Sequence, residues 1–331
     1  MSNKYIGIDI GGANTKIASS DKEIIELHYL PLWKNTSLPK VLKDIAQRLK
    51  PKKVGVVMTG ELADCFKSKE EGVCFIMDAV NNAFDTSDAS LYYLDLDGNF
   101  TPYPSNPRSL AAANWIASTT LIGMEFEDCI FLDIGSTTSD IIPIINSKPV
   151  ASKTDFERLK RDELVYTGVL RTNIATLFNL DHKVKIQDVH CRVSSELFAI
   201  TADAYLLLDE ITKELYTCET PDGAEKDKDS ARLRLARLVC ADLTEISEKE
   251  ITDIARQVKE VQVNDIANAI QTQINKYPNL DNIVATGLGE FLVESIANQL
   301  NLEYVLVSEI YGKEISKVFP AYAVARLLES T

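Results

Sequence analysis

Residues 131–144 read FLDIGSTTSDIIPI, and residues 5–18 read YIGIDIGGANTKIA. Aligned on Asp9 and Asp133, both strings contain Asp-Ile-Gly, then small residues rich in hydroxyl or amide groups, and then isoleucine. An apolar run that ends in aspartate and glycine predicts a buried strand followed by a tight turn. The chain therefore carries two copies of one strand-turn-strand unit, one in each half.

The segments around these two hairpins show alternating strand and helix patterns. Beyond the hairpins, we expect strands at residues 23–32, 54–58, 74–80, 90–95, 283–285 and 304–307. We expect helices at 38–50, 110–121, 231–243, 248–258, 265–276, 291–300 and 321–328, and an exposed loop at 217–229. These patterns predict an α/β protein with an N-terminal domain, residues 1–127, and a C-terminal domain, residues 128–331. The last helix is expected to pack back on the N-terminal domain.

Composition excludes several classes of function. Lys and Arg total 35 against 49 acidic residues, so the net charge is −14, which argues against binding to nucleic acid or an anionic membrane. Six cysteines without a CxxC pair, and only three histidines, argue against structural zinc. We find no signal peptide and no apolar run that could span a membrane. We therefore expect a cytoplasmic protein, and its oligomeric state has no signature in the sequence.

The glycine turns have a chemical use, because successive free N–H groups in such a turn form a site for anions. A third glycine turn, Thr286-Gly287-Leu288-Gly289, follows the strand at 283–285, and both a Walker loop and a GxGxxG fingerprint are absent. Asp9 and Asp133 precede the first two turns and are the expected Mg²⁺ ligands, directly or through water. The residues expected to hold phosphate groups are Gly11, Gly12, Asn14, Thr15, Lys16, Gly135, Ser136, Thr137, Thr138, Gly287 and Gly289.

The order of these three motifs resembles that of the actin, Hsp70 and sugar-kinase superfamily. The second motif is most similar to that of its hydantoinase and oxoprolinase branch. This resemblance covers nearly the whole chain and implies two ribonuclease-H-like (actin-like ATPase) domains, with a ligand cleft between them and a hairpin from each domain gripping the phosphate groups.

A closer resemblance lies in VMTGELADCF (57–66), RDELVYTGVLRTN (161–173), HCRVSSELFAITADAY (190–205), CETPDGA (218–224), RLRLARLVCAD (232–242) and ATGLGEFL (285–292). These segments are similar to those of the synthases of methanofuran biosynthesis. The resemblance implies transfer of an (aminomethyl)furan-methyl group from its diphosphate to the phenol oxygen of γ-glutamyltyramine. An ether forms, diphosphate leaves, and the glycine turns hold that diphosphate.

A carboxylate could take the proton of the phenol, whose pKa is ~10 in the free molecule. We favour Glu61, which follows a strand end, with Asp140 and Glu163 as alternatives beside Asp9 and Asp133 in the catalytic set. Arginine can bind carboxylate or phosphate in bidentate fashion. The expected substrate-binding residues are Arg161, Thr167, Gly168, Arg171 and Arg192. Lys16 is expected either to add positive charge or to point away, and Arg232, Arg234 and Arg237 to be mostly exposed.

Two other functions compete with this interpretation. The superfamily resemblance alone predicts an ATP-dependent small-molecule kinase, although Gly-Leu-Gly-Glu in the third turn is a poor match to an adenosine pocket. A nucleotide-binding regulatory protein is the second alternative. A hydantoinase or oxoprolinase subunit is disfavoured, because those chains are longer than 331 residues.

Overall fold

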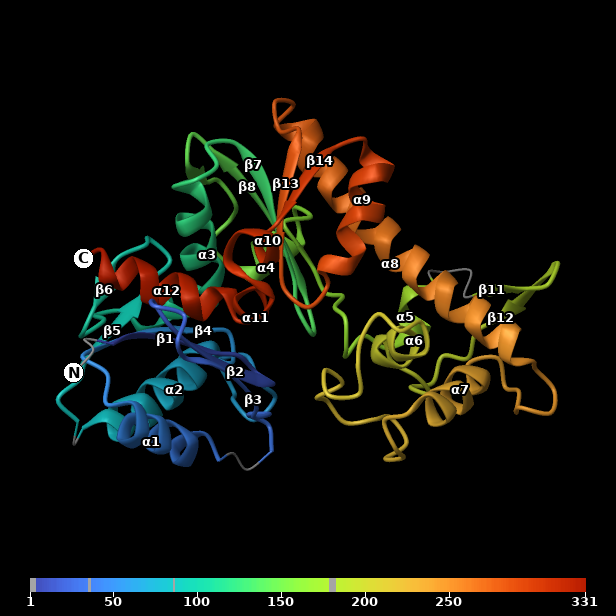
Figure 1. Ribbon diagram of the computed structural model, residues 1–331, viewed down its shortest axis with the longest axis horizontal. Helices are drawn as coiled ribbons and strands as arrows, with labels where there is room; N and C mark the ends of the chain where they lie inside the picture. Colours follow the sequence, from blue (N-terminus) through green and yellow to red (C-terminus); the bar gives the residue numbers. More distant parts are fainter. Residues whose placement is uncertain (1–3, 35–36, 86, 179–182) are drawn as a thin grey trace. The chain divides into compact units, whose positions relative to one another are not determined.

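The computed structural model describes residues 4–34, 37–85, 87–178 and 183–331 (Figure 1). Contacts divide the chain into two compact units. Unit 1 comprises Met1–Phe131, Ile142–Lys160 and Val305–Thr331, and unit 2 comprises Leu132–Ile141 and Arg161–Tyr304. Each unit is thus assembled from segments that are distant in sequence, and the predicted domains 1–127 and 128–331 stay a prediction.

The sheet of unit 1 has the strand order β3-β2-β1-β4-β5-β6. Strands β1, β2 and β3 are antiparallel, whereas β4 and β5 run parallel to β1. The strands are β1 (Tyr5–Ile10), β2 (Asn14–Ser19), β3 (Ile25–Tyr29), β4 (Lys53–Met58), β5 (Ser90–Leu94) and β6 (Phe100–Thr101).

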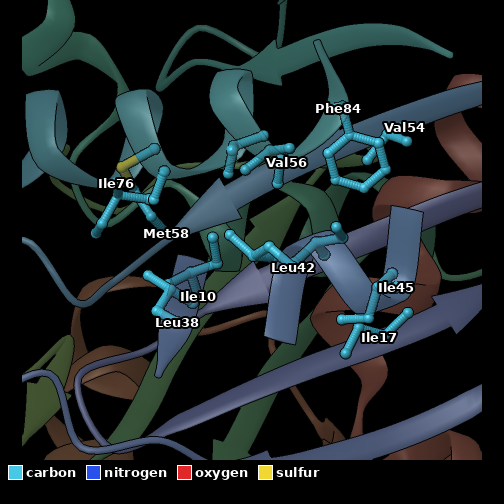
Figure 2. Packing of buried hydrophobic residues seen from close by; sticks show 14 of the residues in the cluster. Ile10, Ile17, Leu38, Leu42, Ile45, Val54, Val56, Met58, Ile76 and Phe84 are labelled. Carbon is cyan, nitrogen blue, oxygen red and sulfur yellow. The ribbon is translucent and has the colours of Figure 1, made fainter. Parts of the chain in front are cut away.

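Helices α1 (Leu38–Leu49) and α2 (Lys69–Phe84) cover one face of this sheet. Figure 2 shows Leu42 of α1 and Phe84 of α2 among side chains from β1, β2 and β4. The strand predicted at residues 74–80 is wrong, because this segment lies within α2. The Ser68 side chain caps that helix, and its buried residues recur with helical spacing rather than alternating.

The opposite face of the sheet receives α12 (Phe319–Glu329), as Figure 1 shows. Gly7 and Gly55 are paired on the adjacent parallel strands β1 and β4. A Cβ at Gly7 would lie 1.8 Å from the Ala321 carbonyl oxygen, and a Cβ at Gly55 would lie 2.3 Å from Val324 Cγ1. The two glycines therefore let the last helix approach the sheet backbone closely, so that it packs on the N-terminal sheet.

Replacing Gly7 with alanine is expected to destabilise unit 1 by about 2 kcal/mol, because the new methyl group forces α12 away from β1. Urea unfolding measures the change. Gly12→Ala is the matched control for stability, since a Cβ at Gly12 meets nothing within 4 Å. Equal stabilities of the two variants would contradict the close packing of α12.

The second sheet has the order β10-β8-β7-β13-β14, with β9 paired to β8. In both sheets the first strand of the glycine hairpin has its return strand on one side and later strands on the other, three in the first sheet and two in the second. The predicted α/β class with a duplicated core is thereby confirmed. The strands are β7 (Cys129–Ile134), β8 (Ser139–Ile145), β9 (Lys148–Pro149), β10 (Leu164–Val165), β13 (Asn282–Thr286) and β14 (Glu303–Leu306).

The remaining helices of unit 1 are η1 (Pro107–Leu110), α3 (Asn114–Gly123), α4 (Asp155–Leu159), α10 (Val307–Tyr311) and α11 (Lys313–Lys317). Unit 2 also contains α5 (Ile174–Leu177), β11 (Lys183–Ile186), β12 (Val189–Arg192), α6 (Thr201–Leu207), α7 (Lys228–Arg237), α8 (Glu248–Lys276), η2 (Glu290–Leu292) and α9 (Val293–Leu300). The helices predicted at 248–258 and 265–276 are one helix, α8, because no residue between them breaks a helix.

Candidate active site

The first glycine hairpin joins β1 to β2 in unit 1. The Gly11 N–H donates to the Asn14 carbonyl oxygen at 2.9 Å, and a Cβ at Gly11 would lie only 2.9 Å from that same oxygen. Gly12 borders open space. Neither glycine has a positive φ, so close approach rather than a left-handed backbone explains glycine at position 11.

Asp9 and Lys16 face each other across this hairpin. The two residues are paired in the register of β1 and β2, and Lys16 Nζ lies 3.3 Å from Asp9 Oδ2. Asp9 is buried, whereas Lys16 is partly exposed. Whether Lys16 adds positive charge to a bound diphosphate stays a prediction.

Glu61 follows the end of β4, and the backbone before it is tied to the first hairpin. The Thr59 and Gly60 N–H groups both donate to the Ile10 carbonyl oxygen, at 2.9 and 3.0 Å. The Glu61 side chain is only 1% exposed, and its Oε2 atom has no hydrogen-bond partner among the described residues. Burial raises the pKa of this carboxyl group to about 7. Glu61 is therefore a buried carboxyl group poised to exchange a proton near neutral pH.

Helix α2 holds the backbone of Glu61 in place. A Cβ at Gly72 would lie 2.2 Å from the Glu61 carbonyl oxygen. Lys69, the first residue of α2, places Nζ 3.9 Å from Glu61 Oε1. The sequence analysis identified Glu61 but missed Lys69, because a lysine in the first turn of a helix has no distinctive pattern.

The second glycine hairpin lies in unit 2 and is wrapped by the segment that follows β10. The Val169 N–H donates to the Gly135 carbonyl oxygen at 3.0 Å, and the Arg171 N–H donates to the Ser136 carbonyl oxygen at 3.1 Å. Arg171 Nη1 donates to Thr137 Oγ1 at 3.3 Å. A Cβ at Gly168 would lie 2.5 Å from the Thr137 nitrogen. The structure therefore brings a predicted substrate-binding segment onto a predicted phosphate turn.

The third glycine turn packs against the strand end that carries Asp133. Gly287 has φ +97°, and a Cβ there would lie 2.6 Å from Asp133 Oδ1. The Gly289 N–H donates to the Ile134 carbonyl oxygen at 3.0 Å. Glycine is required at position 287 both for its backbone conformation and for the approach of the carboxylate. The second and third glycine turns are thus neighbours in unit 2.

The buried side chain of Gln262 holds the segment that wraps the second hairpin. Gln262 Nε2 donates to Thr167 Oγ1 at 2.6 Å and to the Gly168 carbonyl oxygen at 3.0 Å. The Gln262 amide oxygen accepts a hydrogen bond from the Tyr205 hydroxyl group. Ser139 Oγ donates to the Thr167 carbonyl oxygen at 2.8 Å. The wrapping segment is thus held by buried side chains from β8, α6 and α8.

Comparison with known proteins shows the family of this chain. Residues 52–331 match the hydantoinase/oxoprolinase family. The chain belongs to this family. Among its relatives is the (4-{4-[2-(gamma-L-glutamylamino)ethyl]phenoxymethyl}furan-2-yl)methanamine synthase of Methanocaldococcus jannaschii, which is 40% identical over 98% of this chain and 97% of that protein. The synthase of the same name from Methanococcus vannielii is 40% identical over 62% of this chain and 92% of that protein.

A solved structure of nucleotide-free acetone carboxylase is also similar to this hydantoinase/oxoprolinase-family protein. The likeness covers 92% of this chain and 50% of that chain, at 12% identity and a TM-score of 0.49.

The other predicted residues of this hydantoinase/oxoprolinase-family protein lie on several elements of unit 2. Asp140 on β8 and Glu163, which immediately precedes β10, are both buried, and Lys276 Nζ lies 3.7 Å from Glu163 Oε1. Arg161 is exposed, and its carbonyl oxygen accepts a hydrogen bond from Gln273. Arg192 belongs to the separate β11–β12 ribbon and is exposed. Their predicted roles stay predictions.

The residues predicted to bind Mg²⁺ are single carboxylates. Among the described residues, no group of three or more His, Cys, Asp or Glu side chains could hold a metal ion. Asp9 and Asp133 each supply one buried carboxylate at the mouth of a glycine turn. Each of these carboxylates, taken separately, fits Mg²⁺, which usually takes one or two carboxylates together with water and phosphate oxygens. Across the described residues, no helix is both long enough and apolar enough to cross a membrane.

The expectation that the arginines of residues 232–237 are mostly exposed is wrong for Arg234. Arg234 is completely buried, and Nη2 lies 2.7 Å from Oδ1 of Asp203, which is also completely buried. Its Nη1 lies 3.1 Å from Asp222 Oδ1. Arg237 is exposed as expected and also pairs with Asp222, at 3.0 Å. Because Asp203 is 31 residues away in sequence, no local pattern could have indicated the buried pair.

Proposed function

We propose that this protein is a cytoplasmic synthase of methanofuran biosynthesis that forms the ether named in its relatives, (4-{4-[2-(γ-L-glutamylamino)ethyl]phenoxymethyl}furan-2-yl)methanamine. The observation that carries the proposal is the 40% identity to a synthase of that name, extending over 98% of this chain and 97% of the relative. Because the match spans almost all of both chains, it supports the same overall activity and not only a shared domain.

The proposed reaction is an alkyl transfer with diphosphate as the leaving group. The bond between the furan-methyl carbon and the diphosphate oxygen breaks, and a bond from that carbon to the phenol oxygen of γ-glutamyltyramine forms. The phenol loses its proton. Because the furan ring stabilises positive charge on its CH₂ group, the main task for the protein is to stabilise the departing anion.

The glycine turns are the proposed diphosphate-binding segments, namely Gly11 and Gly12 in unit 1 and, separately, Gly135–Thr138 in unit 2. Lys16 and Arg171 support this role, because each places a cation beside one of the hairpins. Asp9 and Asp133 would hold Mg²⁺, which supplies charge neutralisation for the diphosphate when it is bound. Arg161, Arg171 and Arg192 are the candidates to bind either the glutamyl carboxylate or the diphosphate.

Glu61 is the proposed acceptor of the phenol proton. Its raised pKa, about 7, lies nearer to that of a phenol, ~10, than the pKa of an ordinary carboxyl group does. A base whose pKa is close to the working pH is ionised in a large fraction of molecules and still binds the proton well. Asp140 and Glu163 remain the alternatives.

Calorimetry in the presence of Mg²⁺ tests the ligand class, by comparing diphosphate with ATP and a non-hydrolysable ATP analogue. We expect diphosphate to bind and ATP to bind negligibly. Arg171→Gln should weaken diphosphate binding about tenfold, which corresponds to ~1.4 kcal/mol. Arg256→Gln, which removes an exposed arginine of α8, is the control and should change nothing.

Conversion of γ-glutamyltyramine and the furan-methyl diphosphate to the ether tests the reaction itself, with mass spectrometry as the readout. Binding of ATP that depends on its adenine, together with absence of the ether, would instead favour the kinase. Nucleotide binding without turnover of any acceptor would favour the regulatory protein.

A further inference from the structure

A chain of alternating charges extends from Glu61 through unit 1. Lys69 Nζ lies 3.9 Å from Glu61 Oε1 and also 3.9 Å from Asp155 Oδ2. The lysine is thus placed between two carboxylates that are 94 positions apart in the chain. Neither Lys69 nor Asp155 has a role in the proposed reaction as described so far.

Asp155 is held in position by a buried arginine. Arg158 Nη2 donates to Asp155 Oδ1 at 2.7 Å, and Arg158 is only 3% exposed. The guanidinium carbon of Arg158 lies 5.1 Å from the centre of the Trp115 ring, which is itself buried. Because planar stacking and a charged hydrogen bond both restrain the arginine, the carboxylate of Asp155 has a defined place beside Lys69.

Four other charged groups near these residues, Glu70, Glu71, Glu157 and Asp9, have contacts of their own. They form ion pairs or hydrogen bonds with partners other than Glu61, Lys69 and Asp155. These contacts are Glu70 with Arg108 at 3.0 Å, Glu71 with the Lys67 N–H at 2.8 Å, Glu157 with Lys160 at 2.9 Å, and Asp9 with Lys16 at 3.3 Å.

We propose that Lys69 and Asp155 are positioning residues that set the protonation state of Glu61, and that they act in opposite directions. The ammonium group of Lys69 favours the ionised carboxylate, whereas the negative charge of Asp155 favours the protonated form. The inference rests on the proposed function, because it concerns the group proposed there as the proton acceptor.

The opposition of these two charges has a chemical purpose in an alkyl transfer to a phenol. Burial alone would keep Glu61 protonated and unable to accept a proton. A lysine without Asp155 would keep the carboxylate ionised and weaken its basicity. Burial is the largest cause of the raised pKa of Glu61, about 7, and around it Asp155 raises the pKa while Lys69 lowers it.

Carboxyl ¹³C NMR titration of the substrate-free protein tests the inference without any turnover. The Glu61 resonance is assigned by its loss in Glu61→Gln. We expect Lys69→Met to raise the pKa of Glu61 by about one unit, and Asp155→Asn to lower it by a similar amount. Lys67→Met is the matched control, because it removes an exposed lysine two residues away and should leave the titration unchanged.

The two variants keep the test decisive even if one folds poorly. Asp155→Asn removes a partner of buried Arg158, whereas Lys69 is about one-third exposed and its replacement should be tolerated. A Glu61 titration that Lys69→Met leaves unchanged, or moves downward, would overturn the inference.

The pH profile of kcat separates this inference from the proposed function. If the variants shift both the NMR titration of Glu61 and the pH profile of kcat, the inference and the proposed function are both supported. If the NMR titration shifts and the pH profile does not, Lys69 and Asp155 still control Glu61, but Glu61 is not the base.

Discussion

Replacement of Glu61 with glutamine is expected to lower kcat by about 10²–10⁴-fold, with a much smaller effect on KM. The range is that of a lost general base. Glutamine keeps the size of the side chain and contacts similar to those of the buried carboxyl group, but it cannot accept the phenol proton. Steady-state kinetics with both substrates measures the effect. Glu71→Gln is the control, since Glu71 is exposed and should leave kcat unchanged.

The same variant should also change how stability depends on pH. The pKa of Glu61 rises from 4.5 to about 7 on folding, so the folded state binds this proton more tightly than the unfolded state. Ionisation of Glu61 therefore costs stability progressively as pH rises from about 4.5 through 7. We expect Glu61→Gln to be more stable than the parent at pH 8 by up to ~3 kcal/mol, and the difference to vanish near pH 4.5.

Urea unfolding at several pH values measures this difference. If the free energies of unfolding of the two proteins ran parallel between pH 5 and pH 8, the raised pKa would be refuted. Loss of activity with parallel stability curves would mean that Glu61 acts by its shape or hydrogen bonding rather than as a titrating base.

Removal of the Arg234 side chain is expected to destabilise unit 2 by about 4 kcal/mol. Arg234→Met leaves the completely buried carboxylate of Asp203 without its cation, and an uncompensated buried charge of this kind typically costs 3–5 kcal/mol. The Tyr216 hydroxyl group, which donates to Asp203 at 2.9 Å, offsets only part of that cost. Urea unfolding monitored by circular dichroism gives the free energy.

Two further variants isolate the buried pair. Arg237→Met removes an arginine that also binds Asp222 but is 45% exposed, so it should cost less than about 1 kcal/mol. The double variant Asp203→Asn/Arg234→Met should recover much of the lost stability, because no unpaired charge remains. A double variant no more stable than Arg234→Met alone would show that packing of the arginine, rather than its charge, matters.

This ion pair gives several of the sequence motifs a structural meaning. Asp203, Asp222 and Arg234 come from three different segments that resemble the synthases, at 190–205, 218–224 and 232–242. The sequence alone could not separate such segments from substrate-binding ones, because both contain charged residues among small and apolar ones. In the structure, Arg234 joins all three segments within unit 2, so their shared pattern reflects folding at these positions.

The features that the sequence predicted well depend on local patterns. The two hairpins and helix α12 were predictable, because strand alternation, glycine turns and helical spacing all act within a few residues. Residues 74–80 were assigned to a strand because a short apolar run fits either structure, and the Ser68 cap outside the run decides in favour of a helix. The glycine at position 7 had no predictable purpose, since its partner, α12, lies more than 300 positions away.

The residues of the candidate site also separate into those that local sequence patterns predicted and those that they did not. Asp9 and Asp133 are the penultimate residues of β1 and β7, and Glu61 follows the end of β4. Positions at the ends of strands are ones that sequence can identify. Lys69 and Asp155 were missed, because their importance arises from contacts between α2 and α4 that only the folded chain forms. Oppositely charged residues so far apart in the sequence follow no periodic pattern, so their contact could not be predicted.

The position of α12 sets an order of events during synthesis. Strand β1 emerges from the ribosome early, yet the helix that covers its Gly7 face is made from residues 319–329. Until that segment is available, one side of the N-terminal sheet lacks its cover, and nascent chains with exposed apolar surface are prone to aggregate. We therefore expect unit 1 to close late, after translation of the rest of the described chain, and folding to be slowed by this long-range contact.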